Sequence, residues 1–372
     1  MVPAGPRRIL RRALFQFVQK ISATEDAREM ACNTLQGLLQ WHPRVTVKSN
    51  EWYLPYSELG TSQLERLPSQ RSDVIILTAR FRSGSTLLWN LFRHLDGITA
   101  YYEPFNERRW FDPRSRGSHM DPTHKNVDDN YRREYDGLAV LQQYYLQEWI
   151  NKSLFMDASF WDPGMKRYVE ILIDKAPGRP VLQFNRIDFR LPWFRHNFPA
   201  ATIIHLARHP RDQWCSSLLD PTCFPKHGRM DQFPLHDKFY LRLWAQDLKY
   251  HFPFLDEKTF EHPYQMFYYI WKLSYIFGKN FSHYTIFFEN FLRNCESQLK
   301  DLFYVLNIKD YDIEILKSLI TEAPVSKWLS YADDEWFRRH ETICETVLAN
   351  FFGISNTISQ PELDDCAVQA TP

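Results

Sequence analysis

The sequence lacks any Cys-x-x-Cys pair, although it contains 6 cysteines in 372 residues. Structural zinc clusters and dithiol redox sites are usually built from such pairs, so neither kind of site is expected. The scattered positions also do not resemble the spacing of a small disulfide-stapled domain. A reduced compartment fits this cysteine pattern best.

An excess of either charge is also missing, since 45 Lys and Arg residues stand against 45 Asp and Glu residues. Proteins that bind polymeric nucleic acid usually carry a basic excess, so nucleic acid is not an expected partner. Any anion that this protein binds must be held by a local cluster of donors and cations.

The N-terminus lacks the roughly 20 consecutive apolar residues that a transmembrane helix needs. Its most apolar part lies in residues 7–18 (RRILRRALFQFV), where Gln16 interrupts the apolar run. The segment has no small-residue cleavage site of a signal peptide. A basic amphipathic helix could lie on a membrane surface, but packing on the domain is favoured. We therefore expect a soluble, cytoplasmic protein without a transmembrane segment.

Short apolar segments alternate with helix-like segments along the middle of the chain. Residues 74–79 (VIILTA) and 201–207 (ATIIHLA) are rich in β-branched side chains, as buried parallel strands are. Further strands are expected at residues 98–102, 181–184 and 284–288, and helices at residues 86–95, 138–150, from 210 onward and 289–306. This alternation predicts an α/β fold with a P-loop-like, parallel five-stranded sheet flanked by helices.

The same pattern divides the chain into three parts. Residues 1–70 carry no strong strand signal and are predicted to form a helical N-terminal extension. Residues 71–354 are predicted to form the main domain, with an irregular insertion at residues 105–137 that is either functional or mobile. Residues 355–372 are a polar tail, which we expect to be disordered.

The candidate site lies after the predicted strands, because ligands of open parallel sheets bind beyond the carboxyl ends of the strands. The first such segment reads Arg82-Ser83-Gly84-Ser85-Thr86. Several backbone N–H groups converge at such a helix N-terminus, and Gly84 would let the backbone approach an anion closely. Hydroxyl groups add donors, and Arg80 and Arg82 add charge. The segment is predicted to bind a phosphate-like anion, with an ordinary capped turn as the alternative.

This loop lacks two features of a nucleoside-triphosphate P-loop. Ser85 follows Gly84 where that motif places a lysine for the β- and γ-phosphates, and the leading glycine is missing. The strand at residues 201–207 is followed by Arg208 and does not end in a Walker-B aspartate. A P-loop-type nucleotide kinase or switch is therefore the less favoured alternative.

The second candidate segment begins at Arg208, at the carboxyl end of a predicted strand. Its guanidinium could bind a second phosphate in a bidentate manner, although a structural salt bridge is the alternative. Ser216 lies about two turns into the following helix, close enough to share that anion. Anion sites at the ends of two strands predict a nucleotide with separated phosphate groups.

These two segments resemble the phosphate-binding motifs of the sulfotransferases that use 3′-phosphoadenosine 5′-phosphosulfate (PAPS). That family carries a strand–[KR]SG[TS]T–helix loop and, further on, a strand–R-x7-S–helix segment. Residues 82–86 and 208–216 match both motifs, spacing included, and Phe288-Glu289-Asn290-Phe291 is similar to the family's YEDL-type element. The resemblance covers roughly residues 74–353.

The resemblance implies in-line transfer of a sulfuryl group from PAPS to an acceptor hydroxyl, leaving 3′-phosphoadenosine 5′-phosphate, with no metal. By the family pattern, Arg82 would also be catalytic, because it would stabilise charge on the bridging oxygen and the leaving phosphate. The residues that would hold the cofactor are Arg82, Ser83, Gly84, Ser85, Thr86, Arg208 and Ser216.

Glu103 is the predicted general base, since it follows the second strand and an acceptor could reach it there. Its Glu-Pro setting resembles the carbohydrate branch of the family, which uses Glu, and the chain as a whole looks closer to that branch and to bacterial members than to the cytosolic small-molecule branch. Neutralisation of Arg108 or Arg109 is the alternative for Glu103.

Other residues are candidate contacts of the substrate. His119 and His124 lie in the irregular insertion and are rival bases or substrate contacts. Arg186 follows the third strand and could contact substrate or cofactor, with an ion pair to Asp188 as the alternative.

The acceptor is expected to be a carbohydrate or another hydroxylated metabolite, either a small molecule or a glycan. The RKGxxG signature of the cytosolic branch is absent, and Ser326-Lys327-Trp328 stands where related enzymes close the nucleotide site. A non-catalytic glycan-binding protein on the same fold is a further alternative, although it would have no reason to keep a PAPS site. The sequence does not indicate an oligomeric state.

Overall fold

The computed structural model describes residues 71–117, 124, 126–127, 131–218, 224–320 and 326–353. The predictions made for residues 1–70, for residues 355–372 and for His119 lie outside the described residues. Among the helices of the described part, none combines the length and the apolar character that crossing a membrane requires.

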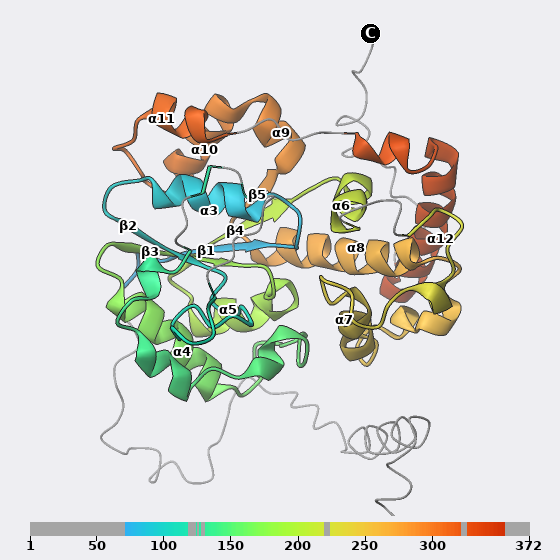
Figure 1. The fold of residues 1–372 in the computed structure, drawn as a ribbon, viewed down its shortest axis with the longest axis horizontal. Coiled ribbons are helices and arrows are strands. Elements are labelled where there is room, and N and C mark those ends of the chain that lie inside the picture. The colour runs from blue at the N-terminus through green and yellow to red at the C-terminus, as the bar shows by residue number, and fades with distance from the viewer. Residues whose placement is uncertain are drawn as a thin grey trace, which may run out of the picture. The chain divides into compact units, whose positions relative to one another are not determined.

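Five parallel strands form one sheet in the order β2-β3-β1-β4-β5 (Figure 1). The strands are β1 (Ile75–Ala79), β2 (Ile98–Tyr102), β3 (Arg179–Phe184), β4 (Thr202–Ala207) and β5 (Tyr284–Phe287). In register, Thr78 of β1 lies beside Phe184 of β3 and His205 of β4. The carboxyl ends of the strands therefore meet at one edge of the sheet. The predicted fold class is confirmed.

The central strand β1 is buried along its whole length, which explains its unbroken apolar sequence. Strand β3 begins two residues earlier than predicted and includes Pro180 near its start, where proline is tolerated. The backbone N–H of Arg179 donates to the carbonyl of Gly97 over 2.7 Å, and that of Gly178 donates to the Thr99 hydroxyl over 2.9 Å. These hydrogen bonds to the start of β2 explain why β3 begins two residues before its apolar residues.

Helices flank the sheet, and Figure 1 shows α3 with α9–α11 above it, α4 and α5 below it, and α6, α7, α8 and α12 to its right. The α-helices are α3 (Ser85–Arg93), α4 (Pro163–Lys175), α5 (Leu191–Asn197), α6 (Pro210–Ser217), α7 (Leu241–Leu248), α8 (Pro263–Phe281), α9 (Phe288–Arg293), α10 (Cys295–Val305), α11 (Ile313–Leu319) and α12 (Asp334–Phe352). The short 3₁₀ helices are η1 (Arg133–Tyr135), η2 (Ala139–Gln143), η3 (Gln147–Ile150), η4 (Asp188–Arg190), η6 (Met230–Gln232), η7 (Pro253–Leu255), η8 (Glu257–Thr259) and η9 (Lys327–Ser330).

Two helix predictions were wrong in form. Residues 138–150 contain the two 3₁₀ helices η2 and η3, and Leu138 and Leu141 are buried three residues apart, which is the 3₁₀ period. Residues 289–306 contain two helices, α9 and α10, because the chain leaves helical geometry at Asn294. The described part of the irregular insertion holds turns and the single turn η1.

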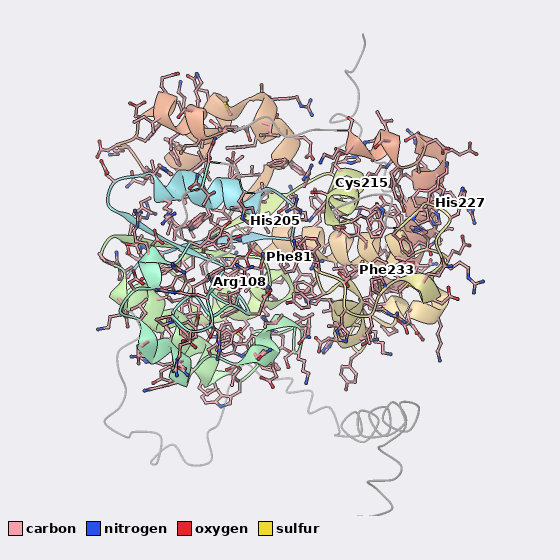
Figure 2. All side chains as sticks on the ribbon, viewed as in Figure 1. Phe81, Arg108, His205, Cys215, His227 and Phe233 are labelled. Carbon is pink, nitrogen blue, oxygen red and sulfur yellow. The ribbon has the colours of Figure 1, made fainter. Side chains whose placement is uncertain are left out.

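Two hydrophobic clusters make up the core. One surrounds the sheet, and the other is built mainly from α6, α7, α8 and α12, with Phe277 of α8 packed against both. Phe81, two residues after β1, packs on the second cluster, and Figure 2 labels it between the sheet on one side and Cys215 and Phe233 on the other. The loops that leave the strands therefore lie where the two clusters meet.

Candidate functional site

Charged residues follow every strand at the carboxyl edge of the sheet. In sheet order they are Glu103 after β2, Arg186 after β3, Arg82 after β1, Arg208 after β4 and Glu289 after β5. Because neighbouring strands lie about 4.8 Å apart, this row extends over roughly 20 Å. The candidate residues, predicted from separate segments, therefore form a row along one edge of the sheet. The half near β2 contains Glu103 and Arg186, and the half near β4 contains residues 82–86, Arg208 and Ser216.

The loop after β1 has an unusual backbone. Arg82 and Gly84 both adopt left-handed conformations, with φ of 64° and 95°. The N–H and hydroxyl of buried Ser83 donate to the Arg80 carbonyl over 3.3 and 2.6 Å, which closes the turn. Helix α3 then starts at Ser85 with Gly84 as its N-cap, so no capping side chain covers its first N–H groups.

Gly84 packs closely against an aromatic ring. A Cβ atom at this position would lie 2.2 Å from the ring of Phe288 in α9, so the ring fills the space that a side chain would need. The lack of a side chain at Gly84 therefore permits the close approach of Phe288. The close approach of an anion to the same backbone stays a prediction. The YEDL-like segment at residues 288–291 thus packs directly on the loop.

The structure brings the two predicted anion-binding segments together. Arg82 Nε donates to Ser216 Oγ over 3.2 Å, and Arg208 Nη1 donates to the Arg82 carbonyl over 2.9 Å. Arg82 and Ser216 are 134 residues apart in the sequence. One cluster of donors therefore contains residues from both segments.

Arg208 is buried beside this cluster. Its guanidinium carbon lies 5.0 Å from the Phe288 ring centroid, and its Nε lies 3.9 Å from Glu289 Oε1. That oxygen accepts the backbone N–H of His209 over 3.0 Å, and Arg208 Nε has no hydrogen-bond partner among the described residues. Burial lowers the pKa of Arg208 and raises the pKa of Glu289. In the alternative of a structural salt bridge for Arg208, Glu289 is the carboxylate. At 3.9 Å, however, it does not satisfy the buried Arg208 Nε among the described residues.

Arg80 does not join this cluster. Its guanidinium carbon lies 4.3 Å from the ring centroid of Trp244 in α7, and burial lowers its pKa to about 10. Its Nη1 is buried and has no hydrogen-bond partner in the described part of the chain. We expected Arg80 to add charge at the anion loop, but its guanidinium group packs on Trp244 instead.

Glu103, at the other end of the row, is buried and surrounded by donors. Its Oε2 accepts from Asn106 over 2.6 Å and from Arg186 over 3.2 Å, and its Oε1 accepts from Asn185 over 2.5 Å. Glu103 itself has a left-handed φ of 40°. The alternative of neutralising Arg108 or Arg109 is wrong, because the cation that pairs with Glu103 is Arg186.

Arg186 bridges two carboxylates and does not pair with Asp188. Besides Glu103, it donates to Glu107 Oε2 over 2.6 Å. Asp188 accepts the hydroxyls of Thr78 and Ser274 over 2.5 and 2.7 Å, so the alternative ion pair is wrong. Burial lowers the pKa of Arg186, but the carboxylates of Glu107 and Glu103 outweigh this and raise it overall.

Tyr102 connects the two halves of the row. Its hydroxyl is 3.1 Å from Thr86 Oγ1, and burial together with the charge of Glu103 raises its pKa well above the ordinary value. His124 Nε2 lies 3.2 Å from the same Thr86 oxygen, and its Nδ1 contacts the Tyr131 hydroxyl. The rival base His124 therefore lies against the anion loop, and its described hydrogen bonds are not to Glu103.

Some residues that shape the site were not predicted from the sequence. Asn106 closes a turn, since its N–H donates to the Glu103 carbonyl over 2.9 Å, and the Glu-Pro-Phe-Asn sequence was a usable turn signal. Asp212 in α6 accepts the N–H of Ser326 over 2.8 Å and that of Trp328 over 3.4 Å. The segment expected to close the nucleotide site is thus attached to the helix that carries Ser216, and no local sequence signal reveals this.

No family model matches the sequence, and no curated protein matches it. Solved structures that are similar to it include three sulfotransferases or sulfotransferase domains. The sulfotransferase domain from the curacin biosynthetic pathway is 18% identical, with 79% of this chain and 95% of that one covered and a TM-score of 0.36. Sulfotransferase STF9 from Mycobacterium avium is 12% identical, with 76% and 77% covered and a TM-score of 0.38. The sulfotransferase domain of the Synechococcus PCC 7002 olefin synthase is 16% identical, with 80% and 96% covered and a TM-score of 0.29.

At these identities and TM-scores the similarities assign no role to any side chain. The chemistry of the site follows from its own geometry. One half gathers cations, hydroxyls and helix N–H groups, which suits phosphate or sulfate oxygens. The other half holds a fixed, buried carboxylate, which suits proton transfer.

Proposed function

We propose that this protein is a sulfotransferase that uses PAPS and acts on a hydroxyl group of its acceptor. The observation that carries the proposal is the junction of Arg82, Ser216 and Arg208, in which the two motif segments share hydrogen bonds. A nucleotide that carries phosphate groups at two positions needs two anion sites that lie close together, and this junction joins the two segments that would form them. The missing P-loop lysine disfavours a triphosphate with magnesium.

The buried donors of the junction fit such a nucleotide. Arg208 Nε is buried without a hydrogen-bond partner among the described residues, which costs free energy until an acceptor oxygen binds. Arg208 and Ser216 would hold the 3′-phosphate. The N–H groups at the start of α3, with Ser83, Ser85 and Thr86, would hold the 5′-phosphosulfate. When bound, PAPS supplies the sulfuryl group.

Glu103 would act as the general base that takes the proton of the acceptor hydroxyl. We assign the proton to Oε1, because this oxygen accepts one hydrogen bond from the described residues whereas Oε2 accepts two. Asn106, Asn185 and Arg186 orient the carboxylate. Transfer of the sulfuryl group to the acceptor oxygen would leave negative charge on the bridging oxygen and its phosphate, and Arg82 would stabilise that charge.

Several finer assignments belong to the same proposal. The acceptor would be a small molecule or a glycan, the reaction would need no metal, and the protein would work in the cytoplasm. Arg186 and His124 would contact the acceptor or the nucleotide.

The proposal is tested by thermal unfolding in the presence of nucleotides. We expect 3′-phosphoadenosine 5′-phosphate at 100 times its Kd to stabilise the protein by about 2.7 kcal/mol, because a ligand that binds the folded state raises its stability. ATP with magnesium serves as the control and should stabilise it much less. Equal or greater stabilisation by ATP would favour the kinase alternative and contradict the proposal.

A further inference from the structure

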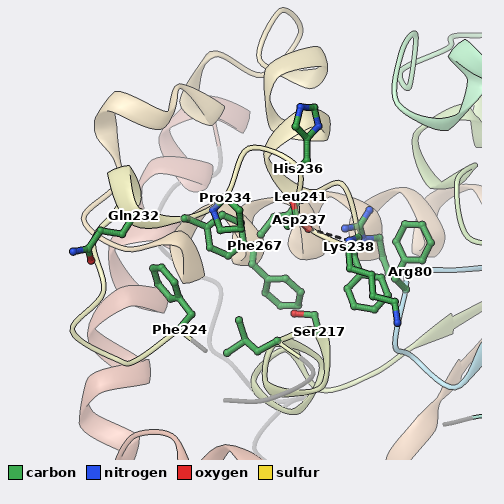
Figure 3. A pocket seen from close by; sticks show the side chains of 14 residues that line it. Arg80, Ser217, Phe224, Gln232, Pro234, His236, Asp237, Lys238, Leu241 and Phe267 are labelled. Atoms are coloured by element: carbon green, nitrogen blue, oxygen red, sulfur yellow. Dashed lines mark hydrogen bonds between the residues drawn. The ribbon is translucent and has the colours of Figure 1, made fainter. Parts of the chain in front are cut away.

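A cavity of about 280 Å³ lies beside the anion junction, between the loop after β1, the end of α6 and the segment that leads into α7 (Figure 3). Ser217 and Leu218, which follow Ser216, form part of its wall. Phe239 also lines it, and the Arg82 guanidinium carbon lies 5.8 Å from that ring's centroid. The cavity therefore adjoins the proposed transfer site without being part of the nucleotide cluster.

The walls of the cavity are mostly apolar and aromatic. The rings that line it are Phe81, Phe224, Phe233, Phe239 and Phe267. Its volume lies near the lower end of the roughly 300–1,000 Å³ of small-molecule sites. These two features suit a molecule with one or two flat rings, and the size excludes an oligosaccharide inside the cavity.

One end of the cavity carries positive charge. Arg80 lines it with a buried Nη1 that has no hydrogen-bond partner among the residues that the structure describes, and Lys238 lines it as well. Asp237 lines the cavity as well, and its carboxylate accepts the N–H groups of Phe239 and Arg242 at the start of α7 over 3.0 and 3.2 Å. The charges of Asp188 and Asp237 oppose the lowering of the Arg80 pKa by burial but do not outweigh it. Figure 3 shows His236 pointing away from the other lining side chains.

We propose that this cavity binds the ring body of the acceptor, and that the acceptor is a hydroxylated aromatic acid whose acid group pairs with Arg80. A buried guanidinium N–H without an acceptor is costly, and a carboxylate oxygen satisfies it with a charge-assisted hydrogen bond. The acceptor role rests on the proposed function, since the hydroxyl receives the sulfuryl group of PAPS and gives its proton to Glu103. Binding of the acid itself does not depend on that function.

The binding test uses titration calorimetry with 2-naphthoate and its neutral amide, 2-naphthamide. We expect the acid to bind on the order of 10- to 100-fold more tightly than the amide, because a charge-assisted hydrogen bond is stronger than a neutral one. Arg80→Met keeps the length of the side chain and should abolish this preference, and Arg80→Lys should restore part of it. Equal binding of acid and amide to the wild type would overturn the proposal, whether or not the variants fold.

A second variant tests the place of binding. Leu218→Trp should fill the cavity and weaken 2-naphthoate on the order of 10-fold, while 3′-phosphoadenosine 5′-phosphate affinity changes by no more than about twofold. Leu146→Trp, at a position that is 49% exposed, is the matched control and should change neither affinity. Unchanged 2-naphthoate binding in Leu218→Trp would overturn the proposed location.

The acceptor role is tested with 6-hydroxy-2-naphthoate and labelled PAPS. The inference is supported if the wild type sulfates this compound and the rate of sulfation is lower in Leu218→Trp. If the nucleotide binds but the compound is not sulfated, the cavity does not hold the acceptor. If the nucleotide does not bind but 2-naphthoate does, the proposed function is wrong, whereas the inference that the cavity binds an aromatic acid stands.

Discussion

The two halves of the carboxyl edge hold their charged groups in different ways. At the half near β2, the Glu103 carboxylate accepts three side-chain hydrogen bonds and pairs with a cation at 3.2 Å. At the half near β4, Arg208 Nε lies 3.9 Å from Glu289 Oε1 and has no hydrogen-bond partner in the part of the chain that the structure describes.

This difference is informative, because a carboxylate that is already oriented can take a proton from a ligand without rearrangement, whereas an unsatisfied cation gains when an anion arrives. The half near β2 is therefore organised for a proton and the half near β4 for a phosphate. Substitutions in each half test whether that half has only the role assigned to it.

The largest expected effect is that of Glu103→Gln. We expect turnover with PAPS to fall by about 10²–10⁴-fold, because the amide cannot accept the proton, while nucleotide affinity stays nearly the same. Steady-state kinetics and calorimetry measure the two quantities. Glu107→Gln is the matched control, since Glu107 also pairs with Arg186. Turnover that persists in Glu103→Gln would move the base to another residue, with His124 as the first to examine.

The next effect is that of Gly84→Ala on the stability of the half near β4. We expect the free energy of unfolding to fall by about 2–5 kcal/mol, from the left-handed backbone and from overlap with the Phe288 ring. Gly97→Ala is the matched control, because Gly97 has φ of 71° but open space around its Cβ position. Urea unfolding of both variants isolates the contribution of Phe288, and equal losses would show that this contact does not matter.

The smallest effects concern the affinity for 3′-phosphoadenosine 5′-phosphate. Arg208→Ala should weaken binding by about 10- to 100-fold, since it removes charged hydrogen bonds, and Ser216→Ala by about fivefold, since it removes one neutral donor. Titration calorimetry measures both. If both variants bind as the wild type does, the nucleotide is not held at this junction, and the contrast between the two halves is wrong.

Much of the half near β4 could be predicted from the sequence. Residues 82–86 and 208–216 are contiguous segments, each at the junction of a strand and a helix, so local order alone indicates their place at the carboxyl edge. The strands were predicted for the same reason, because buried parallel strands are short and apolar. The helix at residues 138–150 was predicted wrongly, since its apolar pattern did not separate the α-helical period from the 3₁₀ period.

The sequence by itself determined the sheet, the anion loop and the order in which the two anion segments occur along the chain. Only the tertiary structure decided which side chains meet. Ser216 meets Arg82, Arg186 meets Glu103 in place of Asp188, and Arg80 turns to Trp244. The physical reason is that backbone hydrogen bonds and apolar periodicity act over a few residues. A buried side chain, in contrast, takes its partner from whichever strand or helix packs beside it, and strand order sets that choice.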